Sequence, residues 1–221
     1  MSRYLLRFVL ESDAAFGRGD GLAGIVDVEV QHDEYGCPFL GGRSLKGLLV
    51  NECAEILAAI PDGQKSRWQR AAQRIFGCPG SSLADNALMS VGDARLPQDL
   101  LAAIRQDIEN DNSTLKPEQI LESITALRRQ TAMDETGVPL EHTLRTVRII
   151  LRGTPFEASL DFSVDPSADD LALLAACIKA FRRAGTARNR GRGRLNAELV
   201  DHCGHQVTEE YFEMFREVVL S

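Results

Sequence analysis

The stretch from residue 27 to residue 47, DVEVQHDEYGCPFLGGRSLKG, constrains the fold more than any other part of the chain. It begins with an extended, alternating segment that carries Asp27, continues through a polar turn, and ends with two glycines just before Ser44 and Lys46. A long amphipathic pattern follows, which indicates a helix. Because a helix start has free backbone N–H groups and a partial positive charge, we predict that Ser44 and Lys46 contact a phosphate there.

The composition is that of an ordinary globular chain. The 221 residues are 44% hydrophobic and 26% charged, which suffices for one large domain or two small ones. The sequence contains no run of about 18 apolar residues that could span a membrane. The first residues, MSRYLLRFVLES, lack the apolar core and cleavage site of a signal peptide, so we expect a cytoplasmic protein without a membrane partner.

The cysteines do not form a recognisable metal-binding pattern. There are five, scattered along the chain without a CxxC pair, which is typical of buried thiols in a reducing compartment. His202, Cys203 and His205 lie close together in the sequence, but no second cluster has a matching spacing. The sequence therefore argues against a zinc site there.

Basic residues are concentrated in one segment. The net charge of −7 argues against nucleic-acid binding over the whole surface. Residues 182–194, however, contain six arginines and no acidic residue. The part that we name the arginine loop, residues 185–194, alternates glycines with Arg188, Arg190, Arg192 and Arg194. Forked guanidinium groups match phosphates, and glycines permit close backbone approach, so we predict that this loop and Lys46 bind one RNA backbone.

The periodicity of apolar residues and the turn signals divide the chain into mixed strands and helices. Strands are predicted at residues 3–10, 25–30, 88–96, 144–151, 156–164 and 194–202. Helices are predicted at residues 44–60, 66–76, 97–109, 117–127, 165–185 and 208–219. The polar segment between residues 128 and 144 indicates a projecting hairpin or a mobile loop. This order favours an α+β domain with helices on one face of a sheet.

Four stretches resemble motifs of one family, in the same order. PFLGGRSLKG (residues 38–47) resembles a P-x-I-P-G-S-S-L-K-G element, and residues 75–77 with 92–94 resemble an L-F-G … D-A pair. QTAMDETG (residues 130–137) resembles the central segment of type III backbone subunits, and GTARNRGRGRL (residues 185–195) resembles a C-terminal glycine-rich loop. The family is the RAMP superfamily of CRISPR effector proteins, and the resemblance is to its Csm/Cmr-like subunits that cleave target RNA.

This resemblance implies a ferredoxin-like, RNA-recognition-type core with helical insertions and a projecting thumb hairpin. Residues 1–221 would form a single domain, with insertions at about 61–127 and, for the thumb, about 128–145. The implied partners are a guide RNA, a single-stranded target RNA, further copies of the chain and other subunits of the complex. The thumb would interrupt the guide–target duplex, and Met133, Val138 and Leu140 offer apolar wedges for that purpose.

By motif position, Asp27 corresponds to the family's aspartate linked to target-RNA cleavage, whereas Asp33 falls where the family has a turn aspartate. Two departures affect the phosphate contacts. The family's proline before the helix is missing, and Val50 stands where the family often has arginine; Arg43 could supply that contact instead. Together with Ser44 and Lys46, Arg43 completes the implied RNA-binding helix start.

A catalytic Asp27 would orient the 2′-hydroxyl of the target strand or hold a divalent cation, most simply Mg²⁺, so that the hydroxyl attacks the adjacent phosphate in line. The sequence offers no metal ligand besides Asp27 itself. Two alternatives stay open: an inactive structural RNA-binding subunit of the same complex, and a guide-RNA processing endoribonuclease. A guide-RNA processing endoribonuclease normally uses a histidine as its base, and the position of His32 in the sequence indicates a surface loop residue.

Overall fold

The computed structural model describes residues 2–17, 26–78, 87–110, 114–131, 135–138, 140 and 143–220. A four-stranded sheet contains β1 (Arg3–Leu10), β2 (Met89–Val91), β5 (Pro155–Phe162) and β6 (Leu195–Val200), in the order β2-β5-β1-β6. All neighbouring strands are antiparallel. Helix α1 (Gly42–Ala59) follows β1, and α5 (Ala168–Ala180) lies between β5 and β6. This order confirms the predicted α+β, ferredoxin-like fold.

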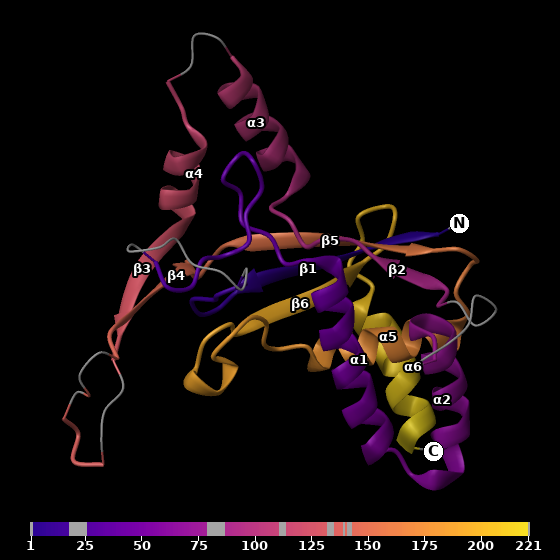
Figure 1. The fold of residues 1–221 in the computed structure, drawn as a ribbon. Coiled ribbons are helices and arrows are strands. Elements are labelled where there is room, and N and C mark those ends of the chain that lie inside the picture. Colours follow the sequence, from indigo (N-terminus) through magenta and orange to yellow (C-terminus); the bar gives the residue numbers. More distant parts are fainter. Residues whose placement is uncertain are drawn as a thin grey trace.

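Alternation along the strands decides which face of the sheet is buried. In β1, Leu6, Phe8 and Leu10 are buried, whereas the residues between them, such as Arg7 and Val9, lie on the other face. Helices α1, α5, α2 (Asp62–Phe76) and α6 (Thr208–Leu220) form a layer below the buried face in Figure 1. The core is therefore the space between this helix layer and the sheet.

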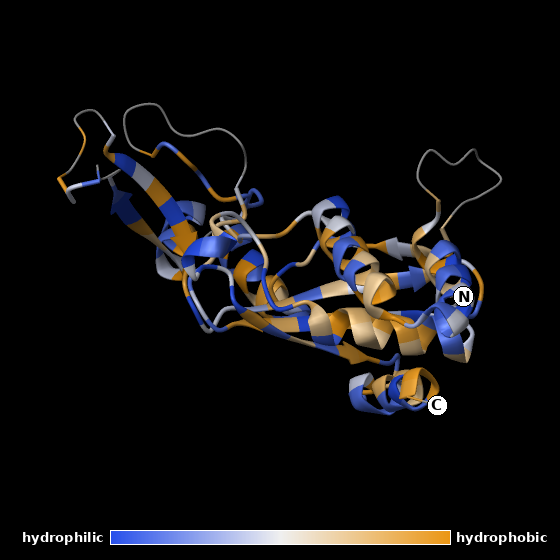
Figure 2. Cartoon of the chain, turned by 90° about the horizontal axis from the view of Figure 1, so that it is seen from below, coloured by the Kyte–Doolittle hydropathy of each residue, from blue (hydrophilic) through white to orange (hydrophobic). Residues whose placement is uncertain are grey.

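Helix α5 is the centre of the helix layer. All its residues from Asp170 to Ile178 are buried. A capping box between Ser167 and Asp170 fixes its start, and Arg74 of α2 pairs with Asp170 at 2.9 Å. By contrast, α6 shows separate orange and blue sides next to the C label in Figure 2, as expected of a helix on the outside of the layer.

Four further elements lie outside the space between the sheet and the helix layer, although buried residues such as Leu101, Ile104 and Ile120 join them to the same hydrophobic cluster. Helices α3 (Gln98–Glu109) and α4 (Pro117–Ile124) rise on the side of the sheet opposite to the helix layer (Figure 1). Strands β3 (Thr125–Gln130) and β4 (Arg145–Ile150) form a separate two-stranded hairpin that extends away from the sheet (Figure 1). The predicted thumb is the outer part of this hairpin. Its segments 132–134, 139 and 141–142 lie outside the described residues.

Two predicted helices end earlier than expected. The helix predicted at 117–127 stops at Ile124, because Thr125 Oγ1 bonds the carbonyl of Leu121 at 2.5 Å and β3 begins there to pair with β4. The helix predicted at 165–185 stops at Ala180 rather than at Gly185. The chain must turn there because the Arg182 carbonyl accepts the N–H of Leu195 at the start of β6, at 3.0 Å, and the Ala184 N–H donates to the carbonyl of Gly193 at 2.9 Å.

Two predicted strands are largely irregular. The strand predicted at 88–96 is regular only as β2, and beyond Gly92 the chain makes single bridges to two different segments. The described part of the strand predicted at 25–30 also forms isolated bridges rather than a regular strand, among them those of Val28 and Val30. Both segments switch partners within a few residues, and alternation in the sequence does not reveal such a switch.

None of the described helices is both long and apolar enough to cross a bilayer. The assignment of residues 1–221 to one domain with insertions stays a prediction. Within the predicted insertion at 61–127, α2 packs in the central helix layer, where its Trp68 ring lies 4.6 Å from that of Phe215 in α6.

Candidate nucleic-acid interface

The segment that carries Asp27 runs beside β4, on the edge of the hairpin that β3 does not occupy. Val28 and Val147 form a parallel bridge, and the Asp27 N–H donates to the Thr146 carbonyl at 2.8 Å. The Asp27 side chain adds a second link, since its Oδ2 accepts the Thr146 N–H at 2.6 Å. The exposed Asp27 is therefore fixed beside the outer part of the two strands, one residue from their end at Gln130 and Arg145, which places it next to the predicted thumb.

The two faces of this edge have different roles. Val28 and Val147 pack with Ala15 and Ile149 in a small apolar cluster. Alternation places Asp27 and Glu29 on the opposite face, as the sequence predicts, alongside Thr146 and Arg148 of β4. One face therefore attaches the hairpin to the body, while the other presents the polar groups.

Glu29 and Arg148 form a buried ion pair that the sequence did not reveal. Arg148 Nε lies 2.8 Å from Glu29 Oε1, and the two side chains are only 12% and 4% exposed. The contact is poorly aligned for a hydrogen bond, and the buried Glu29 Oε2 has no hydrogen-bond partner among the described residues. One signal could have indicated the pair. Arg148 interrupts an apolar strand, and a buried acid on an alternating segment requires a cation.

A divalent cation at Asp27 would find a sparse set of protein ligands. Asp27 Oδ2 is occupied by the Thr146 N–H, and the neighbouring Glu29 is directed to Arg148, so among the described residues one oxygen, Oδ1 of Asp27, has no partner. Mg²⁺ commonly binds through one or two carboxylates and completes its shell with water and substrate phosphates. The residues therefore fit a cation that RNA itself helps to hold, and do not form a complete protein site.

The arginine loop contacts the same hairpin. With its amide turned so that the oxygen faces the guanidinium, Gln130 of β3 accepts from both terminal nitrogens of Arg192, at 2.7 and 2.8 Å. Gly193 has a φ of +70°, and a Cβ there would lie 1.8 Å from the carbonyl oxygen of Ala184. Gly193 therefore serves close packing within the chain, whereas Gly191, at φ +78°, is surrounded by open space.

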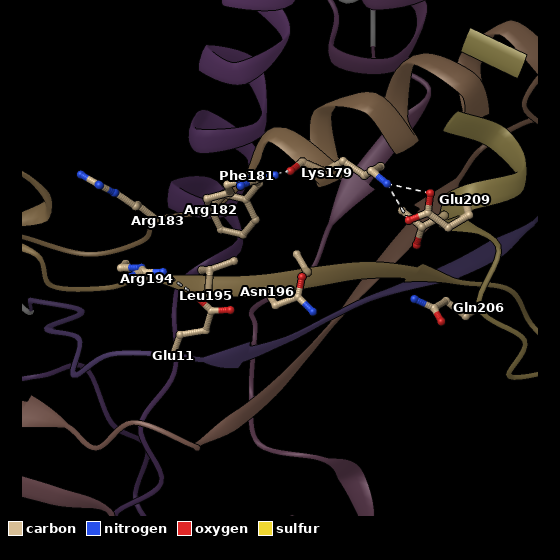
Figure 3. Close-up of a pocket in the computed structure, with 12 residues that line it drawn as sticks. Glu11, Lys179, Phe181, Arg182, Arg183, Arg194, Leu195, Asn196, Gln206 and Glu209 are labelled. Atoms are coloured by element: carbon tan, nitrogen blue, oxygen red, sulfur yellow. Dashed lines mark hydrogen bonds and ion pairs between the residues drawn. The ribbon is translucent and has the colours of Figure 1, made fainter. Parts of the chain in front are cut away.

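The cationic side chains of the loop point mainly to solvent. Arg188 and Arg190 are exposed, and Arg192 is half-buried by its contact with Gln130. Arg194 is exposed but lies 3.4 Å from a carboxylate oxygen of Glu11. Beside the loop, a groove of about 520 Å³ follows the outer edge of β6, and Figure 3 shows its polar lining. The labelled lining residues include Lys179, Arg182, Arg183, Asn196 and Glu209.

The start of α1 is less open to an anion than its sequence suggests. Arg43 and Ser44 are exposed, but the N–H of Gly42 already donates to Asp93 Oδ1 at 2.9 Å. Gly42 cannot carry a side chain, because a Cβ there would lie 2.2 Å from the Val91 carbonyl oxygen. A phosphate at this helix start would therefore meet the side chains of Arg43 and Ser44 while Asp93 keeps the first amide.

Lys46 lies apart from the arginine loop. Its Nζ donates to the Met89 carbonyl at 3.4 Å, and burial lowers the pKa of Lys46. It lines a groove beside β2, whereas the arginine loop leads into β6, and these are the two outer strands of the sheet. Three strand spacings separate them by roughly 14 Å. One phosphate cannot contact both groups, so the predicted shared backbone would have to span several nucleotides.

The described thumb residues are exposed. Val138 is 56% and Leu140 47% exposed, whereas Met133 lies outside the described residues. Two further apolar residues at the hairpin, Leu127 and Leu144, are also exposed and were not singled out from the sequence. The hairpin therefore carries several apolar side chains in water, which is typical of a surface that contacts a partner. Their role as wedges between bases stays a prediction.

Asp33 and His32 have local roles. Asp33 Oδ1 accepts the N–H groups of Tyr35 and Cys37, at 3.1 and 2.9 Å, which confirms a turn aspartate. His32 Nδ1 contacts the Asp33 carbonyl at 3.0 Å. Neither residue belongs to the face that Asp27 shares with Glu29 and Arg148.

The comparisons with known proteins agree with this architecture. A family model described as the RAMP superfamily matches residues 7–196. The chain belongs to the RAMP superfamily. A search of curated proteins finds no match to this RAMP chain.

Solved structures share the fold of this RAMP chain. A chain of the "Type III-B Cmr-beta bound to cognate target RNA" aligns with a TM-score of 0.62 at 12% identity, covering 95% of this chain and 98% of the other. A chain of Type III-B Cmr-beta in the apo state aligns with a TM-score of 0.63 at 13% identity, covering 90% and 98%. At these identities the likeness establishes the fold.

Proposed function

We propose that this RAMP chain is a guide-RNA-binding backbone subunit of a type III CRISPR interference complex, and that it cleaves complementary target RNA at Asp27. Family membership and the shared fold with chains of Type III-B complexes, one of them bound to cognate target RNA, support this proposal. The partners would be the guide RNA, the single-stranded target, further copies of the chain and other subunits, and the complex would act in the cytoplasm.

The guide RNA would be held through its phosphates. Arg188 and Arg190 project into solvent from a loop whose conformation is fixed by internal glycines. Arg43, Ser44 and Lys46 would form a second contact at the other side of the sheet. Phosphate contacts position a nucleic acid without reading its sequence, which suits a subunit that must accept any guide.

One observation carries the cleavage proposal: Asp27 is fixed beside the outer part of the β3–β4 hairpin and, among the described residues, keeps one carboxylate oxygen without a partner on an exposed side chain. A stacked RNA helix does not align a 2′-hydroxyl for attack on its own phosphate. The hairpin, through Val138 and Leu140, would displace one nucleotide and permit that alignment. Asp27 would then be close to the displaced nucleotide.

The reaction would be an internal transfer at phosphorus. The 2′-hydroxyl gives its proton to Oδ1 of Asp27, its oxygen forms a bond to the adjacent phosphorus, and the bond from phosphorus to the 5′-oxygen breaks. The leaving 5′-oxygen takes a proton from water, so the products are a 2′,3′-cyclic phosphate and a 5′-hydroxyl. Alternatively, the same oxygen would hold a Mg²⁺ ion that stabilises negative charge on the phosphate, and a water would then take the proton of the 2′-hydroxyl.

The hydrogen bond from Thr146 to Asp27 favours a second candidate, in which the chain binds RNA but is inactive. In that case Asp27 exists to attach its segment to β4, through the 2.6 Å contact with the Thr146 N–H. The two candidates differ in what they require of Asp27. Cleavage requires its negative charge, whereas attachment requires only an oxygen that accepts a hydrogen bond.

The decisive experiment compares Asp27→Asn with Asp27→Ala in the assembled complex. Asparagine keeps an acceptor for Thr146 and removes the charge, whereas alanine removes both. We expect both variants to assemble and bind guide RNA, and both to lose target cleavage by a factor of at least about 100. Retained cleavage with Asp27→Asn would refute catalysis by Asp27, and a defect confined to Asp27→Ala would identify a structural role.

A further inference from the structure

The turn between β6 and α6 brings together three side chains that bind metals. Asp201, Cys203 and His205 each offer one ligand atom, and these atoms all lie within 4.8 Å of one another. The turn lies away from Asp27 and the hairpin, and the function proposed above does not use it. We propose that Asp201, Cys203 and His205 form a binding site for a transition-metal ion of the zinc class.

The backbone of the turn holds the three residues in place. Asp201 Oδ1 accepts the N–H groups of Cys203 and His205, at 2.9 and 2.8 Å. The Asp201 N–H donates to the His205 carbonyl at 2.9 Å, and the Gly204 N–H donates to the Asp201 carbonyl at 3.1 Å. Gly204 has a φ of +87°, which allows the chain to reverse between the two ligands. The backbone that carries the three ligands is therefore already ordered before a metal binds.

Two ligand atoms already have the spacing that a metal requires. Asp201 Oδ2, the oxygen not used by the turn amides, lies 3.5 Å from His205 Nδ1. Bonds of about 2.0–2.1 Å to a tetrahedral zinc ion place two such ligands roughly 3.3 Å apart. The Cys203 sulfur lies within 4.8 Å of both of these atoms, and its side chain is exposed. The third ligand is therefore already beside the other two.

The donor types select the ion. A thiolate with an imidazole and a carboxylate suits Zn²⁺ and similar ions, whereas Mg²⁺ prefers oxygen ligands alone. Three protein ligands leave a fourth position for water or for a ligand from another subunit. The sequence argued against a metal site here because it considered His202 with Cys203 and His205, whereas the fold brings Asp201 to the other two side chains.

The turn by itself does not account for the side chains at 203 and 205. Its hydrogen bonds use backbone amides and the Asp201 carboxylate, so most residues other than proline at those two positions would satisfy it. Both side chains are exposed and contribute no core packing. The next residues join the turn to the body, since Gln206 bridges to Val200. A bound metal would thus strengthen the link between β6 and α6.

Alkylation of the unmodified full chain tests the site. Of the five cysteines, only Cys78 and Cys203 are exposed, so Cys78 is an internal control. We expect Zn²⁺ at ten times its dissociation constant to slow alkylation of Cys203 about tenfold, because about one site in eleven stays empty, and to leave Cys78 unchanged. Mass spectrometry of the labelled peptides measures both rates in one sample.

Spectroscopy with Co²⁺ identifies the ligands. A thiolate-to-cobalt absorption band should appear at one equivalent, persist in Cys78→Ser, and disappear in Cys203→Ser. His205→Ala and Asp201→Asn should each weaken Co²⁺ binding by about tenfold or more. Equal protection of both cysteines, no protection of Cys203, or a band that survives Cys203→Ser would overturn the proposal. The alkylation result needs no variant, so a folding defect cannot obscure it.

Discussion

Replacing Arg148 by methionine should destabilise the base of the hairpin. Methionine fills much of the same space but leaves the carboxylate of Glu29, whose side chain is 4% exposed, without the cation that lies 2.8 Å away. Breaking a buried ion pair from one side costs about 3–5 kcal/mol. Because the Arg148 side chain is 12% exposed and water can reach part of the site, we expect about 3 kcal/mol.

The assay is thermal and urea unfolding of the full chain, followed by circular dichroism. In a chain of this size, about 3 kcal/mol lowers Tm by roughly 6–12 °C. Arg145→Met is the matched control, since Arg145 lies on the same strand but is exposed, and we expect a change within about 0.5 kcal/mol. A double variant, Glu29→Met with Arg148→Met, removes both charges and should recover most of the lost stability.

Two results would refute this reasoning. If Arg148→Met and Arg145→Met unfold at the same temperature, the buried pair contributes nothing that solvent does not replace. If the double variant is as unstable as Arg148→Met, the loss comes from packing around the guanidinium or from its 3.2 Å hydrogen bond to Thr125 Oγ1, and not from an uncompensated charge on Glu29.

Two further predictions concern the arginine loop. Gly193→Ala should lower the free energy of unfolding by about 3 kcal/mol or more, because the added Cβ would lie 1.8 Å from the Ala184 carbonyl oxygen. Gly191→Ala places its Cβ in open space and should lower it by only about 1 kcal/mol. Chemical denaturation of both variants measures the difference. Replacing Arg188 and Arg190 together by alanine should leave stability unchanged. The plot of log K against log salt for single-stranded RNA binding, measured by titration at several salt concentrations, should become less steep by about 1.4. An unchanged slope would show that neither arginine contacts phosphate.

The sequence predicted the core elements well because their signals are local. The helix at α1 and the strand at β1 carry strong periodicity, and β1 was predicted at its observed bounds, Arg3–Leu10. The errors lie where long-range pairing overrides local preference. Thr125 to Leu127 continue a helical pattern, yet they pair with β4 because Ile149 and Ile150 need a partner strand.

The candidate site could be predicted only in part. Position in a motif indicated Asp27, and composition indicated the arginine loop, since both signals are contained in short stretches. The partners of these groups come from distant parts of the chain: Thr146 binds Asp27, Gln130 binds Arg192, and Asp93 takes the first amide of α1. A single sequence does not indicate such pairs, because nothing local to either residue requires the other.

The buried pair at Glu29 and Arg148 links stability to the proposed chemistry through the length of the hairpin. Six-residue strands extend about 20 Å, so a rotation of about 10° at the base moves the outer end of β3 and β4 by roughly 3–4 Å. A misplacement of about 1 Å can already cost two orders of magnitude in an aligned reaction. Because Arg148 and Thr146 share a strand face, the contacts that fix the hairpin also fix Asp27. The position of Asp27 therefore depends on a firm attachment of the two strands, to which the buried ion pair of Glu29 and Arg148 adds its electrostatic attraction beside the small apolar cluster.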